Sequence, residues 1–148
     1  MTTHFYNAKQ ASEFIKRVLE VRHKIIVRLH HNPTEKSLHM NLIEEQSDGK
    51  TRIHHVKFTR RHYETFGFKF PQYSGQMGES INKEIIDTLQ ENAIIYFVMP
   101  DSIWKITRKD MLECDCQWTP EHRTPVYSIP LSALTEFYNQ SGLNSDPF

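Results

Sequence analysis

The sequence predicts an α+β protein in which a central mixed sheet is flanked by helices, and three patterns carry this prediction. Apolar residues recur at helical spacing over residues 8–22. Between residues 25 and 58, apolar and polar residues alternate, as they do in strands with one buried face. The longest uninterrupted apolar run, Ala93–Met99, is typical of a strand buried on both faces.

The composition favours a single globular domain. The chain has 148 residues, with 18 Lys and Arg against 18 Asp and Glu, which excludes a uniformly cationic nucleic-acid coat and an acidic disordered tail. Its longest apolar run is far shorter than the roughly 20 residues of a membrane-spanning helix, and residues 1–20 contain no apolar signal-peptide core. We therefore expect a soluble, cytoplasmic domain over 1–148, with a core over 8–138 and a flexible tail over 139–148.

The first half of the chain predicts a helix followed by three strands. Asn7 is placed to cap the helix 8–22, and Gln10 is placed to reach back to the cap. Strands are expected at 25–29, 38–46 and 51–58, with a break at 31–33 and a hairpin signal at 47–50.

Burial fixes a preferred register for the hairpin between the second and third strands. A two-residue loop would mix apolar and polar side chains on each face of the sheet. A three-residue loop over 48–50 pairs Leu42 with Val56 and places Asn41 directly opposite Lys57. This register gives one apolar face and one polar face, and the polar face carries His39, Asn41, Glu45, His55 and Lys57.

The second half of the chain predicts further helices and strands around the buried run. Residues 59–78 show no clear pattern, and Ser80 is placed to cap a helix over 81–91. Strands are expected at 93–98 and 103–106, after which Thr107 and Asp110 cap a short helix.

The C-terminal part is expected to contain an irregular loop over 114–124 and a last strand over 126–129. Pro130 then opens a helix with Leu131, Leu134 and Phe137 facing inward.

Basic and aromatic residues gather in one stretch. Residues 50–69 contain six Lys and Arg but one acid, and the rings of Phe58, Tyr63, Phe66, Phe68, Phe70 and Tyr73 lie in or beside it. Surfaces that stack nucleic-acid bases combine cations and rings in this way. The alternative is that the rings belong to the core and the cations to a solvated face.

The order of one helix, three meandering strands, a helix and a buried strand resembles the αβββαβ core of PD-(D/E)XK restriction-endonuclease-like nucleases over about residues 8–107. In that family, an acid on the second strand and an acid-x-lysine motif on the third hold a divalent metal. The corresponding positions are Asn41 or Glu45 on the second strand and His55-Val56-Lys57 on the third. The chain departs from the family at His55 and Asn41, where carboxylates are usual.

The resemblance implies a metal-dependent phosphodiester hydrolase, or a relative that keeps the fold and has lost cleavage. As an enzyme, it would use Glu45 and His55 as ligands of magnesium or manganese, with Asn41 orienting a ligand or a metal-bound water. Lys57 would stabilise developing negative charge. Magnesium prefers carboxylate oxygens, whereas imidazole suits transition metals better.

Nucleic acid is the expected partner, with DNA favoured over RNA. Lys57, Arg60, Arg61 and Lys69 are the expected phosphate contacts. The alternative is a non-enzymatic protein-interaction or oligomerisation module, in which the aromatic stretch 58–73 docks a partner or a second copy in a homodimer.

Histidines and cysteines offer two further candidates. His39 and His55 share a strand face, with His30 on the first strand, and could form a metal or proton-transfer site; half-exposed strand residues are the simpler interpretation. Cys114 and Cys116, with His122, offer three zinc ligands, but the spacing fits ordinary loop thiols better.

Overall fold

A computed structural model of the protein describes residues 5–22, 26–29, 39–46, 48–58, 79–99, 102–120, 123–139 and 142–143. Its helices are α1 (Ala8–Arg22), α3 (Lys83–Asp87), α4 (Arg108–Met111) and the 3-10 helix η2 (Leu131–Ala133). Its strands are β1 (Ile26–Leu29), β2 (His39–Glu45), β3 (Thr51–Phe58), β4 (Glu79–Asn82), β5 (Ile94–Met99), β6 (Ser102–Thr107), β7 (Asp115–Thr119), β8 (Thr124–Ile129), β9 (Thr135–Asn139) and β10 (Gly142–Leu143). No helix in these ranges is long and apolar enough to cross a membrane.

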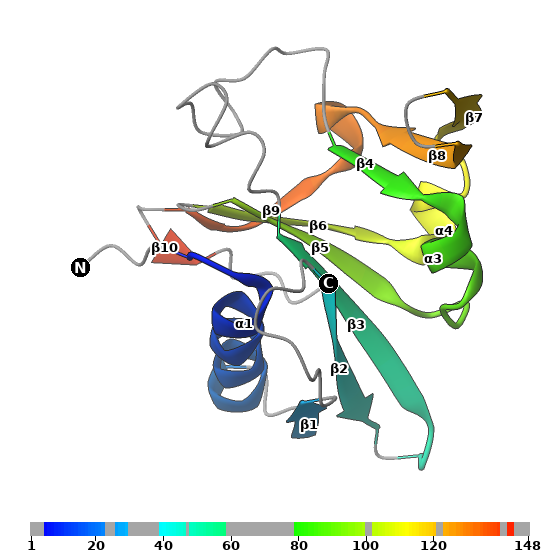
Figure 1. Cartoon of the computed structure of the whole chain (residues 1–148). Coiled ribbons are helices and arrows are strands. Elements are labelled where there is room, and N and C mark those ends of the chain that lie inside the picture. Colours follow the sequence, from blue (N-terminus) through cyan, green and yellow to red (C-terminus); the bar gives the residue numbers. More distant parts are fainter. Residues whose placement is uncertain are drawn as a thin grey trace.

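The strands form two sheets (Figure 1). The larger sheet has seven strands in the order β1-β2-β3-β5-β6-β9-β10, and the smaller one has three in the order β4-β8-β7. Within the larger sheet, β3 and β5 pair in parallel, whereas the other neighbours are antiparallel. The predicted α+β class with a central mixed sheet is therefore confirmed.

The larger sheet separates two hydrophobic cores. One core packs α1 against the sheet, and its members include Ile15, Leu42, Val56 and Tyr96. The other joins the opposite face to the smaller sheet and the short helices, through residues such as Phe97 and Tyr127. Figure 1 shows α1 and the smaller sheet on opposite sides of the larger sheet. The run Ile94–Met99 of β5 is buried throughout because both faces of this strand are covered, as its continuous apolar sequence predicts.

Capping residues in the sequence correctly predict the starts of two helices, α1 and α4. Asn7 Oδ1 accepts a 2.7 Å hydrogen bond from the backbone N–H of Gln10, whose own Oε1 accepts from the N–H of Tyr6. The predicted cap of α1 is therefore confirmed. The Thr107 hydroxyl likewise accepts from the Asp110 N–H at the start of α4.

The hairpin β2–β3 has the predicted faces but a different register. The structure pairs Leu42 with His54 and Asn41 with His55, rather than Leu42 with Val56 and Asn41 with Lys57. The chain reverses between Gln46 and Lys50, whose backbone groups form a 2.9 Å hydrogen bond, one residue earlier than predicted. The two registers differ by two residues, so they place the same side chains on each face, and the apolar pattern cannot distinguish them.

The helix predicted over 81–91 is shorter than expected. Ser80 and Ile81 belong to β4, where Ile81 is buried opposite Tyr127 of β8, and the helix is confined to Lys83–Asp87. The helix ends at Thr88, whose hydroxyl donates a 2.6 Å hydrogen bond to the backbone oxygen of Ile85. The apolar spacing that suggested a helix is thus produced by a strand and a short helix buried in the same core.

The C-terminal predictions fail where strands form by pairing with other strands. The expected loop 114–124 contains β7, which pairs with β8. The helix expected after Pro130 is only η2, and β9 then pairs with β6, so 126–129 is not the last strand. Two residues of the expected flexible tail, 142–143, pair with β9 as β10. Cross-strand hydrogen bonds supply the order that the local sequence does not indicate.

Candidate functional site

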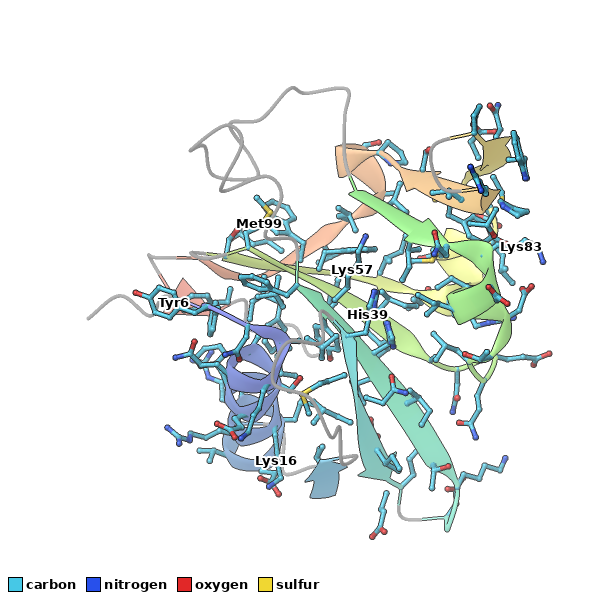
Figure 2. The ribbon with its side chains drawn as sticks, viewed as in Figure 1. Tyr6, Lys16, His39, Lys57, Lys83 and Met99 are labelled. Carbon is cyan, nitrogen blue, oxygen red and sulfur yellow. The ribbon has the colours of Figure 1, made fainter. Side chains whose placement is uncertain are left out.

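Four of the candidate side chains gather on the part of β2 and β3 that lies far from the hairpin turn. His39 lies directly opposite Lys57, and Asn41 lies directly opposite His55. Met40 and Val56, their neighbours along the strands, pack on the α1 side, so strand alternation turns the four polar residues to the other face. Figure 2 shows His39 and Lys57 close together, on the side of the hairpin away from α1.

Hydrogen bonds connect three of these side chains in a row. His55 Nδ1 lies 2.6 Å from Asn41 Oδ1, and His55 Nε2 lies 3.0 Å from His39 Nδ1. Because an amide oxygen only accepts, Nδ1 of His55 carries the proton in this pair. In a neutral imidazole the other nitrogen is then an acceptor, so His55 Nε2 accepts from the Nδ1–H of His39. The row therefore runs from His39 through His55 to Asn41.

Both imidazoles are neutral at ordinary pH. Burial, followed by the charges of His39 and Lys57, lowers the pKa of His55 from 6.5 to about 3. Burial, followed by the charge of Lys57, lowers the pKa of His39 from 6.5 to about 4. His55 is buried, whereas His39 and Lys57 are partly exposed. Of these groups, Lys57 carries the positive charge, and its Nζ also lies 5.9 Å from the ring centre of Phe97.

Glu45 lies apart from this group. It pairs with Thr51 near the turn, four residues along β2 from Asn41, a distance of about 13 Å at the rise of a strand. Glu45 and His55 are therefore too far apart to hold one ion, which corrects the predicted ligand pair.

The remaining residues do not fit a hard divalent metal. The Lys57 ammonium has no lone pair, and the facing nitrogens of His39 and His55 bond to each other. Among the described residues, no group of three or more His, Cys, Asp or Glu could hold a metal ion.

The expected phosphate contacts are only partly within the described structure. Lys57 is described, whereas Arg60, Arg61 and Lys69 lie outside the described residues, as do His30 and the rings from Tyr63 to Tyr73. Phe58 is buried in the core beside α1, so this ring is a core residue, as the alternative interpretation predicts. Stacking or partner docking by the rest of the stretch 58–73 stays a prediction.

A second polar network, which the sequence did not predict, is buried on the α1 side of the same hairpin. His54 Nε2 lies 2.7 Å from Glu44 Oε1, and His54 Nδ1 lies 2.8 Å from the hydroxyl of Tyr96. Burial would raise the pKa of Glu44, but the hydrogen bond and charge of His54 and the charge of Arg52 lower it overall. Burial lowers the pKa of His54 despite Glu44. A neutral His54 therefore donates to the Glu44 carboxylate and accepts from Tyr96 O–H.

The two cysteines are free thiols at the start of β7. Both are half-buried and pack against the second core. Burial, then the charges of Asp110 and Glu113, raise the pKa of the Cys114 thiol, which makes it less reactive. The third candidate zinc ligand, His122, lies outside the described residues.

No protein-family model, curated protein or solved structure matches this chain. The chemistry of the site therefore follows from its own groups: one ammonium, two neutral imidazoles and one amide. These four side chains include no carboxylate. Such a set can bind an anion through Lys57 and exchange hydrogen bonds with neighbouring polar groups of the same ligand.

Proposed function

We propose that this protein binds nucleic acid, with Lys57 and His39 contacting the backbone of the ligand. The observation that carries the proposal is the cross-strand pair itself: on the face of the hairpin away from α1, Lys57 lies directly opposite His39, a neutral imidazole that brings no negative charge to this position. Lys57 also lies one residue from the end of β3, and the basic residues Arg60 and Arg61 follow in the sequence. Phosphate contacts are typically made by such cations.

We also propose that the fold is a degenerate form of the restriction-endonuclease-like core. Its support is the element order α1, β1, β2, β3, β4, α3, β5, in which β4 belongs to the smaller sheet and β5 joins the larger sheet in parallel beside β3. In this alignment, Asn41 and His55 occupy positions where nucleases hold a metal. Here the two side chains hydrogen-bond to each other, which favours the interpretation that the chain binds nucleic acid without the family's metal chemistry.

The test of binding compares two lysines on the same hairpin. Labelled single-stranded and duplex oligonucleotides are titrated with the protein at about 50 mM and about 200 mM salt. We expect affinity to fall steeply with salt, and Lys57→Ala to weaken binding and reduce the salt slope by about 1. Lys50→Ala removes the same charge from an exposed turn residue and should leave affinity unchanged. Absence of binding at low salt, or equal effects of the two variants, would contradict the proposal.

Metal-dependent hydrolysis stays a separate prediction with its own assay. Cleavage is measured with magnesium, manganese and zinc for the wild-type protein and the variants His55→Ala and Lys57→Ala. A degenerate core predicts no cleavage with any of these metals. Cleavage that both variants abolish would instead establish the active nuclease.

A further inference from the structure

The strand β7 forms one edge of the smaller sheet. Within the part of the chain that the structure describes, it pairs with β8 alone, and Figure 1 shows it at the outer end of that sheet. Its residues Asp115, Gln117 and Trp118 are exposed. A strand in this position presents a row of N–H and C=O groups with which another extended chain can pair. The outer side of β7 is therefore a template for a further strand.

A large aromatic ring lies on this edge. Trp118 is 60% exposed, although strand alternation places it on the same face as Cys116, which packs against the second core. Edge strands are usually protected from pairing by lysines, proline or a bulge. Residues 115–119 contain no lysine or proline, and their pairing with β8 has no register shift. A strand added beside β7 would place a side chain next to Trp118 and cover part of its ring.

The charges beside this edge are negative. Asp110, Glu113 and Asp115 are exposed at the beginning of β7, and residues 110–119 contain no Lys or Arg. Burial, then the charges of Asp110 and Glu113, raise the pKa of the Cys114 thiol, so both carboxylates lie close to the start of the strand. No ion pair between described residues includes one of these three acids. The edge is therefore complementary to a cationic chain and disfavours the backbone of a nucleic acid.

We propose that the outer edge of β7 binds an extended cationic peptide, which adds a fourth strand to the smaller sheet. Backbone hydrogen bonds along β7 supply affinity, and the neighbouring acids select a strand that carries Lys or Arg. A cationic side chain of the peptide that lies over the Trp118 ring adds a cation–π contact. This interaction does not depend on the proposed nucleic-acid binding, which involves the hairpin β2–β3 of the larger sheet.

The experiment titrates the whole protein with three short synthetic peptides at low salt. A Lys-Val repeat combines positive charge with strand propensity, a Glu-Val repeat reverses the charge, and a Lys-Pro repeat keeps the charge but cannot pair as a strand. We expect the Lys-Val peptide to bind at least about 10-fold more tightly than either control and to shift the NMR signals of the β7 backbone amides. Equal binding of the Lys-Val peptide and either control, or absence of its binding, overturns the proposal.

Matched variants test the ring and the charge separately. Trp118→Thr removes the ring, keeps a good strand residue and should weaken the Lys-Val peptide about 3-fold or more. Tyr6→Thr removes a ring that is 73% exposed before α1 and should leave the affinity unchanged. Asp115→Lys should weaken the peptide more than Glu91→Lys, which makes the same charge reversal at an exposed residue outside β7. Equal effects within either pair of variants overturn the assignment to this edge.

Sedimentation of the protein without peptide tests the competing occupant, a second copy of the chain. We expect a monomer, because the acids beside β7 require a cationic partner. A dimer that Trp118→Thr dissociates would show that two copies pair through this edge, and it would overturn the proposal. Displacement of the Lys-Val peptide from wild-type protein by Glu-Val peptide would overturn it as well, since the acids would then select nothing.

Discussion

Asn41 and His55 lie directly opposite each other on β2 and β3, and the Asn41 amide oxygen accepts a 2.6 Å hydrogen bond from Nδ1 of His55. Through this one bond, an amide on β2 decides the proton positions of two imidazoles. A carboxylate at the same place would stabilise a charged imidazolium, whereas the amide leaves His55 neutral. Replacing the Asn41 amide by a carboxylate would therefore be enough to change the charge of His55.

Asn41→Asp should raise the pKa of His55 well above its value of about 3. The expected increase is about 1–3, because a carboxylate at hydrogen-bond distance favours the imidazolium form. The measurement is an NMR pH titration of the His55 ring protons. Gln117→Glu makes the same change at an exposed position of the smaller sheet and should leave the His55 titration as in the wild type. Identical titrations for the two variants would contradict the assigned contact.

Tyr96→Phe should lower the free energy of unfolding by about 1–3 kcal/mol, the usual cost of an unsatisfied buried group. The variant removes the hydroxyl that donates to Nδ1 of the fully buried His54 and leaves this acceptor without that donor. Urea unfolding measures the change.

The control for Tyr96→Phe is Tyr6→Phe, which removes a hydroxyl from a side chain that is 73% exposed. It should be indistinguishable from the wild type. A Tyr96→Phe protein as stable as this control would show that the buried network contributes nothing measurable.

The faces of the hairpin could be predicted from the sequence, but its register could not. Alternation places Met40 and Val56 in the core and His39 and Lys57 on the other face in either register. In the observed register the chain turns at Gly49, which has a φ of +83° and whose N–H bonds to the backbone oxygen of Gln46. The apolar pattern contains no information on this choice.

The sequence indicates the buried network of His54 only through polar residues at positions of an otherwise apolar strand face. Glu44 and His54 fall at positions of the apolar face, and polar residues there indicate either exposure or mutual bonding. Tyr96, which completes the network, is 42 residues away from His54, and no local pattern connects them. The strands β7, β9 and β10 were missed for a related reason, because each depends on a partner strand rather than on its own spacing. Of these three strands, β9 has the distant partner, β6, whereas β7 and β10 pair with the strands next to them in sequence.

Acid should destabilise the protein, because His39, His54 and His55 all have lowered pKa values when folded. The pKa of these histidines in the unfolded chain is about 6.5. Below this pH the unfolded chain binds more protons than the folded one, so the free energy of unfolding decreases as the pH decreases. The loss of stability extends from pH 6.5 down to about pH 4 for His39 and about pH 3 for His55. Each histidine contributes at most about 1.4 kcal/mol per pH unit.

Urea unfolding at about pH 7.5 and about pH 5 measures this acid sensitivity, in the range where unperturbed histidines titrate. His54→Gln should reduce the difference between the two pH values, even if it lowers stability at both. Equal stability of the wild-type protein at the two pH values would contradict the lowered pKa values.

Gly49→Ala should cost about 1–2 kcal/mol of stability, because an L-residue with a side chain pays this in a left-handed conformation. No atom lies within 4 Å of the added Cβ, so the cost comes from the backbone and not from a clash. Lys50→Ala, one residue further along the same exposed turn, should change stability by less than about 0.5 kcal/mol.

The same variant tests whether this turn selects the register that builds the site. If it does, Gly49→Ala should weaken the NMR contacts between the backbones of Asn41 and His55, because the register with Asn41 opposite Lys57 buries the same apolar side chains. Binding of nucleic acid should then fall together with these contacts, since His39 no longer lies opposite Lys57. A variant that loses stability but keeps the Asn41–His55 contacts would show that the strands themselves hold the register.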